Sequence, residues 1–361
     1  MEWLSNFGLI LAHIFLLTNG YSQLTNRSHI DQYINFISVW EDVSKAFLGY
    51  LIILGTVVLS ITIVRKRLKY EWWYWVHLFN YFAYILFAGH QLNLGLSANS
   101  LPFMIYWVAL YIFAFGNLGW YRFWLPVYRF YKHRFTISDV QTFPDSEVTN
   151  VSITGKKLER LTIQAGQFFI FRFLQTGKWY EAHPFSMSTY PTGQSIRITA
   201  KNLGDFTAKM PELKVGTKVL IDGPHGVFTT KQSKQNKVLL LAGGIGITPL
   251  RSLAEQFVAE GKDVKMIYGV KTTKDLVLID ELKQLSQNSN FKLTTCLSDQ
   301  DHPDHAKGYI DQNLLTQEVP DLLERDVYLC GPPIMMDKLK VTLLKDLKLS
   351  HDQFHWERFA L

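Results

Sequence analysis

Cysteine is scarce in this chain, which has only two, Cys296 and Cys330, among 361 residues. A plant-type iron–sulfur cluster is held by four cysteine thiolates. The chain therefore cannot build such a cluster, which excludes a reductase that carries its own ferredoxin-like domain. Two thiols also provide no disulfide framework, and a reducing compartment fits this composition.

Charge is scarce in the first third of the chain. Residues 1–121 are rich in Leu, Ile, Phe, Trp and Tyr, whereas the sequence from about Phe135 onward alternates like a globular protein. Much of the net charge of +6 lies beside the apolar segments. Because membrane-flanking positions explain that excess, we expect no nucleic-acid partner.

Four apolar stretches fill this first part, at about 3–18, 44–64, 72–91 and 103–121. The last three approach the ~20 residues that cross a bilayer core. Residues 1–134 are thus predicted to form a transmembrane helical domain of about four helices, in contact with membrane lipid. The first stretch is also open to interpretation as a signal peptide, although Glu2 replaces the usual basic start.

Basic residues flank these stretches unevenly. Four lie between the second and third stretches and four follow the last: Arg65, Lys66, Arg67, Lys69, Arg122, Arg129, Lys132 and Arg134. Cytoplasmic loops are enriched in Lys and Arg. The sequence therefore predicts a multi-pass protein of the cell membrane, with the soluble part in the cytoplasm.

Three histidines interrupt the apolar stretches: His13, His77 and His90. An ionisable side chain at membrane depth is costly, and a neutral imidazole is a good axial ligand for haem iron. His77 and His90 are 13 residues apart, or roughly 20 Å of helix rise, which suits two stacked haems. That spacing also turns the rings roughly 140° apart. The alternative is that each histidine hydrogen-bonds a neighbouring helix.

Residues 135–232 contain short alternating strand patterns with Gly and Pro between them, which predicts a small antiparallel β-barrel. The tetrapeptides HPFS and GDFT lie in this region, at 183–186 and 204–207. A flavin needs an aromatic or apolar surface along its ring and a hydroxyl near N5. HPFS supplies both residue types.

Residues 233–361 alternate strand and helix patterns, which predicts an α/β nucleotide-binding domain with a parallel sheet. Its first strand runs into a glycine turn that allows close approach to a pyrophosphate. Thr248 is the expected N-cap of the following helix, and Pro249 suits the first helical turn. The residues concerned are Gly243, Gly244, Gly246, Thr248 and Pro249.

The motifs HPFS, GDFT, GGIGITP and CGPP, in this order, resemble the ferric reductase and NADPH oxidase family, with its ferredoxin–NADP reductase-type module for FAD and NAD(P)H. The resemblance implies that Phe185 packs on the flavin, Ser186 hydrogen-bonds it, and the GDFT amides with the Thr207 hydroxyl hold the FAD phosphates. His183 stands where soluble reductases carry Arg. The implied FAD-binding residues are His183, Pro184, Phe185, Ser186, Gly204, Phe206 and Thr207.

The resemblance also implies a hydride path. Cys330 would line it beside Ser186, with Gly331 and Pro332 in the cofactor site, and Phe359 would lie against the flavin until nicotinamide displaces it. A buried structural thiol is the alternative for Cys330, and a buried edge-strand side chain is the alternative for Phe359.

Two signals conflict over NADH and NADPH. Lys271 follows a predicted strand, where it suits the extra phosphate of NADPH. Ser298 is followed by Asp299, however, where many NADPH-dependent members of the family carry Arg. The choice stays open.

For the membrane part, the resemblance implies haem b. In the family, six helices hold two haems through histidines of the third and fifth helices. His77 and His90 match the fifth helix and His13 matches the third, so the chain looks shortened by two helices and part of another. His13 and His90 would then hold the outer haem, and His77 would lack its family partner. A fragment, a misassigned start or a partner subunit that supplies the missing helices would explain this.

Three functions follow from these patterns. In the first, electrons pass from cytosolic NAD(P)H through FAD and haem to ferric iron or dioxygen across the membrane. In the second, a membrane-anchored flavin reductase without haem acts on quinone or on a partner protein. In the third, the chain is a non-catalytic membrane scaffold, against which the intact HPFS, GGIGITP and CGPP motifs argue.

Overall fold

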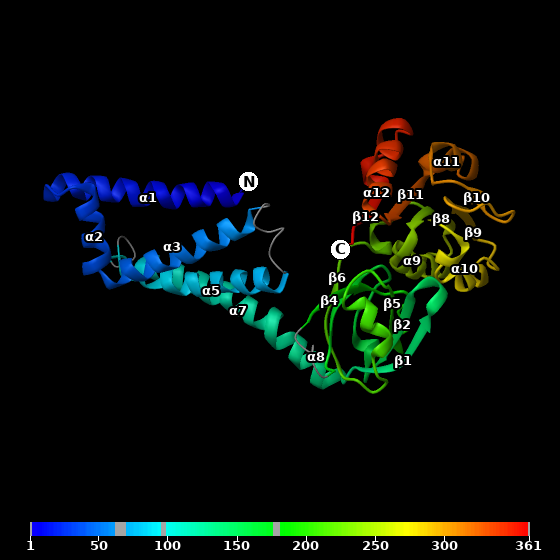
Figure 1. Cartoon of the computed structure of the whole chain (residues 1–361), viewed down its shortest axis with the longest axis horizontal. Helices are drawn as coiled ribbons and strands as arrows, with labels where there is room; N and C mark the ends of the chain where they lie inside the picture. The colour runs from blue at the N-terminus through cyan, green and yellow to red at the C-terminus, as the bar shows by residue number, and fades with distance from the viewer. Residues whose placement is uncertain (1, 62–69, 95–98, 176–180, 360–361) are drawn as a thin grey trace. The chain divides into compact units, whose positions relative to one another are not determined.

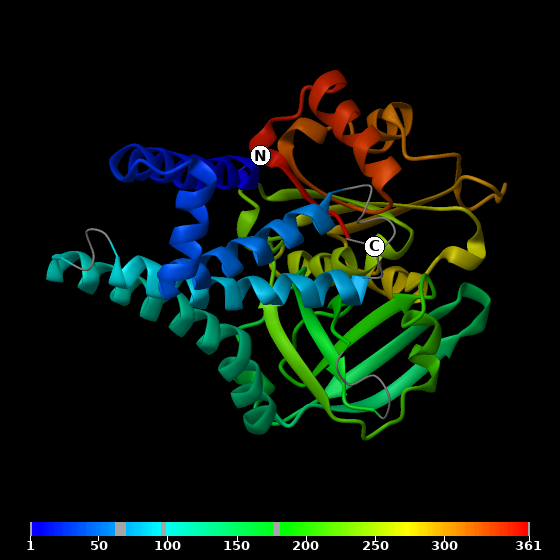
Figure 2. The same ribbon diagram turned by 60° about the vertical axis from the view of Figure 1, so that its left-hand side comes forward.

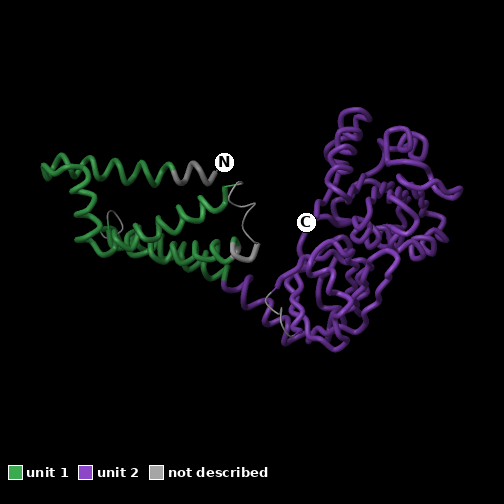
Figure 3. Tube along the Cα trace, in the orientation of Figure 1, with its two compact units in different colours: residues 1–118 green, residues 119–361 purple. Residues whose placement is uncertain are grey.

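The computed structural model describes residues 2–61, 70–94, 99–175 and 181–359. The chain divides into two compact units, Met1–Leu118 and Gly119–Leu361 (Figure 3). Four of the basic residues used to predict orientation, Arg65, Lys66, Arg67 and Lys69, lie outside the described residues.

The first unit is helical throughout its described residues (Figure 1). Helices α3 and α5 pack closely, since a side chain at Gly49 would come within 3.1 Å of the Ala83 carbonyl oxygen. The Thr56 hydroxyl donates to the Asn80 side chain across the same contact, at 3.0 Å. The helices are α1 (Glu2–Thr25), α2 (His29–Val39), α3 (Glu41–Ser60), α5 (Tyr70–Asn93) and α7 (Leu101–Leu118).

Among the described residues, two helices are long and apolar enough to cross a membrane: Glu41–Ser60 and the continuous helix Leu101–His133. Four stretches were expected from the sequence. Length and composition alone do not establish a membrane span, so the transmembrane domain remains a proposal.

The second unit begins with a π-helical turn, η1 (Gly119–Trp124), and helix α8 (Leu125–His133). Pro126 and His133 of α8 are buried, and the His133 ring nitrogen Nδ1 contacts the Lys156 carbonyl at 2.8 Å. Helix α8 therefore belongs with the barrel that follows it, whereas the sequence placed the domain boundary after residue 134.

Two three-stranded antiparallel sheets form the FAD-type barrel predicted for residues 135–232. Isolated bridges, Thr136 to Lys218 and Met187 to Ile198, join the two sheets. Phe169, Phe171 and Phe173 alternate along one strand and fill the core. The sheets are β1 (Thr136–Phe143), β2 (Val148–Thr154) and β5 (Ser195–Lys201), and β4 (His183–Ser186), β3 (Phe168–Phe173) and β6 (Val219–His225).

The predicted α/β domain is confirmed as a six-stranded parallel sheet in the order β10-β9-β8-β7-β11-β12. Alternate residues of β7 face opposite layers: Val238 and Leu240 pack with α9 and α10, whereas Leu239 packs with α11 and α12. Figure 2 shows helices of this domain on both sides of the sheet. The elements are β7 (Lys237–Gly243), α9 (Ile247–Ala259), β8 (Asp263–Val270), α10 (Ile279–Leu285), β9 (Phe291–Leu297), β10 (Ala306–Lys307), α11 (Gln312–Glu318), β11 (Arg325–Cys330), α12 (Pro333–Val341) and β12 (Phe354–Glu357).

The order of this sheet fixes where a ligand binds. Strand β7 is followed by β8 on one side and pairs with β11 on the other. Crevices form at such a switch point, outside the carboxyl ends of the strands. The glycine turn after β7 and the CGPP motif after β11 therefore meet at the same edge.

A charged cluster joins the barrel to the α/β domain. Glu281 of α10 accepts two hydrogen bonds of 2.8 Å from Arg197 of β5, and Arg251 of α9 contacts it at 2.9 Å. The Ser252 hydroxyl of α9 donates to the Thr189 carbonyl at 2.7 Å. These contacts orient the two halves of the second unit.

We expect Glu281→Ala to destabilise the second unit by about 1.5–3 kcal/mol, because two half-buried guanidinium groups lose their shared acceptor. Thermal release of bound flavin should then occur several degrees lower. Asp301→Ala is the matched control, since it breaks an exposed pair with Lys307 at 2.8 Å and should leave the release temperature almost unchanged. Equal shifts in the two variants would contradict the role of Glu281.

Candidate active site

Strand β4 ends at Ser186, which is buried in the barrel. Ser186 pairs with Phe168 of β3, and it is 6% exposed. Its hydroxyl oxygen is buried and has no hydrogen-bond partner among the described residues. A buried hydroxyl without a partner costs free energy, so this atom is well suited to hydrogen-bond a bound group.

Aromatic rings form a platform next to Ser186. The ring of His183 stacks on Phe206 with centroids 3.6 Å apart and planes 15° from parallel. Phe185 lies 6.2 Å from the same Phe206 ring. Residues from HPFS and GDFT, about twenty positions apart in the sequence, thus share one aromatic surface. Pro184 lies exposed in the same strand.

The GDFT turn is held by its own threonine. The Thr207 hydroxyl accepts hydrogen bonds from the amides of Leu203 and Gly204, both at 3.0 Å, and can donate to the Gly204 carbonyl. Space around Gly204 is open. The hydroxyl therefore fixes the shape of the turn, and its contact with FAD phosphates remains a prediction.

The glycine turn after β7 contacts the CGPP motif through backbone atoms. Cys330 pairs with Ala242 in the parallel sheet. A Cβ atom on Gly246 would lie 2.4 Å from the Cys330 carbonyl oxygen, and one on Gly331 would lie 3.0 Å from the Gly243 Cα. No larger residue fits at Gly246 without moving the backbone. Gly244 has a φ of +51°, which glycine adopts without steric cost.

The start of helix α9 corrects one expectation. Gly246, not Thr248, is the N-cap, because the turn tightens into a short 3-10 segment, Gly244–Gly246, before the helix begins at Ile247. Thr248 lies inside the first turn, where its hydroxyl donates to the Ile245 carbonyl at 3.1 Å. Pro249 lies in the first turn as expected. The helix amides still face the ligand edge of the sheet.

Cys330 is fully buried at this edge. Burial raises the pKa of its thiol far above the usual range, with a smaller contribution from Glu357. A thiol held in its neutral form is a poor nucleophile. Cys330 therefore suits a lining role beside the reacting groups, with Gly331 and Pro332 closing the turn against Gly243.

Glu357 is a site residue that the sequence motifs did not indicate. It ends β12 opposite Cys330, and its Oε2 atom is buried without a partner among the described residues. Its Oε1 atom lies 3.7 Å from the position of a Cβ on Gly226, next to the end of β6. Burial raises the pKa of this carboxyl to about 7. The sequence could have indicated Glu357 by its position at the carboxyl end of a strand that follows the CGPP motif.

Phe359 follows Glu357 and packs, half-buried, against the core cluster that contains Cys330 and Phe228. This position is compatible with both interpretations made from the sequence. Its role against the flavin face remains a prediction.

The two signals for the nicotinamide cofactor lie side by side. The Asp299 amide donates to the Lys271 carbonyl at 2.9 Å, and the Ser298 hydroxyl donates to the Asp299 carboxylate at 2.6 Å. Lys271 is exposed at the end of β8. The positive Lys271 and the negative Asp299 thus lie at the same edge of the sheet, and the geometry favours neither NADH nor NADPH.

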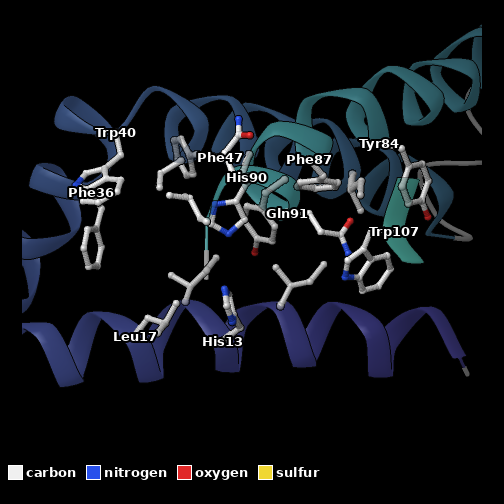
Figure 4. A pocket seen from close by; sticks show the side chains of 18 of the residues that line it. His13, Leu17, Phe36, Trp40, Phe47, Tyr84, Phe87, His90, Gln91 and Trp107 are labelled. Carbon is white, nitrogen blue, oxygen red and sulfur yellow. The ribbon is translucent and has the colours of Figure 1, made fainter. Parts of the chain in front are cut away.

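In the first unit, His13 of α1 faces His90 of α5 across an apolar cavity of about 1470 Å³ (Figure 4). The ring centroids are 6.2 Å apart. His77 is placed elsewhere: its ring nitrogens contact the Ser60 hydroxyl at 3.0 Å and the Trp73 carbonyl at 2.7 Å. His77 therefore follows the alternative interpretation, in which the histidine hydrogen-bonds a neighbouring helix. No group of three or more His, Cys, Asp or Glu fit to bind a metal occurs among the described residues.

Two families match the second unit. Residues 131–229 match the FAD-binding domain family, and residues 240–340 match the oxidoreductase NAD-binding domain family. Both matches lie outside residues 1–118 of the first unit.

Curated relatives agree with these matches. The chain is 29% identical over 230 residues to the toluate 1,2-dioxygenase electron transfer component of Pseudomonas putida, covering 62% of this chain and 66% of that protein. It is 30% identical over 187 residues to the glycine betaine monooxygenase reductase subunit of Chromohalobacter salexigens, covering 49% and 50%. The chain thus covers between half and two thirds of the length of these two relatives.

Solved structures show the same fold. The FAD/NAD-binding domain of nitric oxide dioxygenase from Vibrio cholerae has a TM-score of 0.55 at 23% identity, covering 62% of this chain and 97% of that chain. A ferredoxin NADP+ reductase from Neisseria gonorrhoeae has a TM-score of 0.54 at 20% identity, with the same coverage.

The second unit therefore matches the FAD-binding and NAD-binding domain families and has the fold of a ferredoxin NADP+ reductase. This unit is an NAD(P)H-dependent flavoprotein oxidoreductase module. This result argues against the non-catalytic scaffold. The resemblance to ferric reductases and NADPH oxidases, drawn from the motifs of the second unit and the histidines of the first, remains a proposal.

Ser186→Ala should slow reduction of the flavin by NAD(P)H about tenfold, because one hydrogen bond of about 1.4 kcal/mol to the reacting ring is lost. Stopped-flow absorbance of the bound flavin measures this rate. Ser138→Ala is the control, since Ser138 lies on β1 and donates to the Ser152 carbonyl at 3.1 Å. An unchanged rate in Ser186→Ala would remove Ser186 from the site.

Glu357→Gln should change how stability depends on pH. The raised pKa, about 7 against an ordinary 4.5, means that the folded protein binds this proton more tightly than the unfolded chain. The contribution of Glu357 to stability therefore falls as pH rises from about 4.5 to about 7. The variant should lose this fall, of up to about 3 kcal/mol. Parallel stability curves for the two proteins between pH 4 and pH 8 would contradict the assignment.

Proposed function

We propose that this oxidoreductase is a membrane protein that passes electrons from NAD(P)H through FAD to one haem b held in the first unit. The observation that carries the proposal is the pair His13 and His90, which face each other inside an apolar cavity (Figure 4). FAD supports this step because it accepts a hydride and releases electrons singly.

The histidine pair would hold the iron of one haem b, which would supply one-electron transfer. The centroids of His13 and His90 are 6.2 Å apart. The Nδ1 atom of His90 is buried without a partner among the described residues.

The surroundings of the pair suit a large planar apolar group. Aromatic and aliphatic side chains from five helices line the cavity, among them Leu17, Phe36, Phe47, Phe87, Trp107 and Tyr111. Burial among such side chains controls the redox potential of a haem. The cavity therefore supplies both ligands and a low-dielectric setting.

His77 does not support a second haem in this chain. Both of its ring nitrogens contact other groups, and its ring lies 3.9 Å from that of Trp73. The proposal is therefore one haem in the described residues. A partner subunit that supplies further helices is the remaining route to a second one.

Hydride transfer is attributed to the residues at the sheet edge. Phe185 and Phe206 would offer the ring surface, and the buried Ser186 hydroxyl would donate a hydrogen bond to FAD, which would supply hydride acceptance. The glycine turn, which lies against Cys330, would hold the dinucleotide. Glu357 carries a proton for much of the time at neutral pH, so it limits negative charge where hydride arrives.

The membrane placement rests on the helices Glu41–Ser60 and Leu101–His133. We place the first unit in the cell membrane and the second in the cytoplasm, with the acceptor, ferric iron or dioxygen, on the far side. The resemblance to ferric reductases and NADPH oxidases supports this acceptor class.

The relatives favour a second candidate, in which electrons go to a partner protein without haem. Two of them are named as an electron transfer component and a reductase subunit of oxygenases, and a third as a component of a sodium-translocating NADH-quinone reductase. In that case the first unit anchors a reductase that serves an oxygenase, a ferredoxin or quinone.

A visible spectrum of detergent-purified protein separates the two candidates. We expect a Soret band that sharpens on reduction in the native protein, and its loss in both His13→Leu and His90→Leu, because each removes one axial ligand. His77→Leu is the matched control and should keep the band. A yellow protein without a Soret band would support the haem-less reductase instead.

A further inference from the structure

Six exposed aromatic residues lie close together where the second unit begins. They are between 48% and 72% exposed, and we call them the aromatic belt: Trp120, Tyr121, Phe123, Trp124, Tyr128 and Tyr131. They belong to η1 and α8. Soluble surfaces rarely leave so many large apolar side chains together, and such patches usually mark an interaction site.

The segment that carries the belt is anchored to the barrel by its other residues. Pro126 and His133 are buried, and the Arg129 guanidinium donates to the Gly223 carbonyl of β6. Arg122 lies 3.9 Å from Asp222 in the same strand. The belt is therefore the outward part of a helix fixed to the barrel.

The belt is continuous with a candidate membrane span. The helix runs without a break from Leu101 to His133, and its most apolar window has no buried residues. Ile112 and Phe113 in that part are each 69% exposed. If the apolar part of this helix lies in the bilayer core, the aromatic belt that follows it lies in the headgroup layer.

The chemistry of the segment matches a headgroup layer. Trp and Tyr concentrate at the interface between lipid and water. Residues 119–134 contain four Lys or Arg and no acidic residue. Arg122 and Arg129 contact β6, whereas Lys132 and Arg134 are exposed, and basic segments next to a membrane are attracted to anionic lipids. Lys132 lies over the Tyr128 ring at 5.1 Å, with its charge beside the belt.

We propose that η1 and α8 lie in the headgroup layer of an anionic membrane and hold the FAD barrel at its surface. This inference rests on the proposed membrane function, and it adds the surface by which the reductase module docks. Bilayer lipid is the partner, in preference to a second protein, because the belt extends an apolar helix and carries only positive charge.

The anchoring contacts connect this surface to the flavin site. Arg129 and Arg122 hold β6 at Gly223 and Asp222. Strand β6 pairs with β3, where Phe168 lies between His225 and Ser186. The helix that carries the belt is thus linked through β6 and β3 to β4, the strand of the Ser186 hydroxyl.

Single cysteine labels on the full chain test the proposal, because both native cysteines are fully buried. Spin labels are attached to Tyr131→Cys in the belt, to Ile112→Cys in the apolar helix, and to Tyr309→Cys on the α/β domain as a water-exposed control. The protein is reconstituted in vesicles of mixed neutral and anionic phospholipid. Collision of each label with lipid-soluble oxygen and with a water-soluble nickel chelate is then measured.

We expect the label at 131 to lie at headgroup depth. Its collision rates with oxygen and with the chelate should fall between those of the label at 112, which collides mainly with oxygen, and the label at 309, which collides mainly with the chelate. When anionic lipid is omitted, the label at 131 should move toward water. If the label at 131 is as exposed to the chelate as the label at 309 while the label at 112 is in lipid, the docking surface is overturned. The membrane proposal then stays intact. Labels at 112 and 131 that are both in water overturn both proposals. Immobilisation at 131 without lipid indicates a protein partner and also overturns this inference.

Discussion

The contact between the glycine turn and the CGPP backbone is the constraint on which the active site depends. Gly246 lies against the Cys330 carbonyl so closely that a single methyl group would collide with it. The contact brings two strand ends together at the switch point of the parallel sheet. Because it is made by backbone atoms, its geometry does not depend on side-chain rotamers, and a bound nicotinamide meets a rigid edge.

Around that edge the protein leaves polar groups without partners. Ser186 Oγ and Glu357 Oε2 are buried without hydrogen bonds among the described residues, and the pKa of Glu357 is raised to about 7 for that reason. Folded proteins rarely tolerate such atoms unless a ligand or a function compensates for them. The same argument applies to His90 in the first unit, so the two proposed redox sites share one physical signature.

Much of the second unit could be predicted from local pattern. The strands that lead into the glycine turn and into the CGPP motif could be predicted because each depends on a local residue pattern. The roles of Ser186, Gly246 and Cys330 stay predictions. The N-cap at Thr248 was wrong because the chain tightens into a 3-10 turn first, which no propensity of Thr reports. Glu357 was missed because its importance comes from pairing with Cys330, 27 positions away.

The sequence by itself determined the order of the domains, the strand and helix periods, and the residue types that a flavin and a dinucleotide require. Only the tertiary structure decided which of the three histidines His13, His77 and His90 face each other. His13 and His90 meet across a cavity, while His77 turns to Ser60. The reason is that periodicity fixes the face of one helix, whereas the partner of that face depends on how separate helices pack.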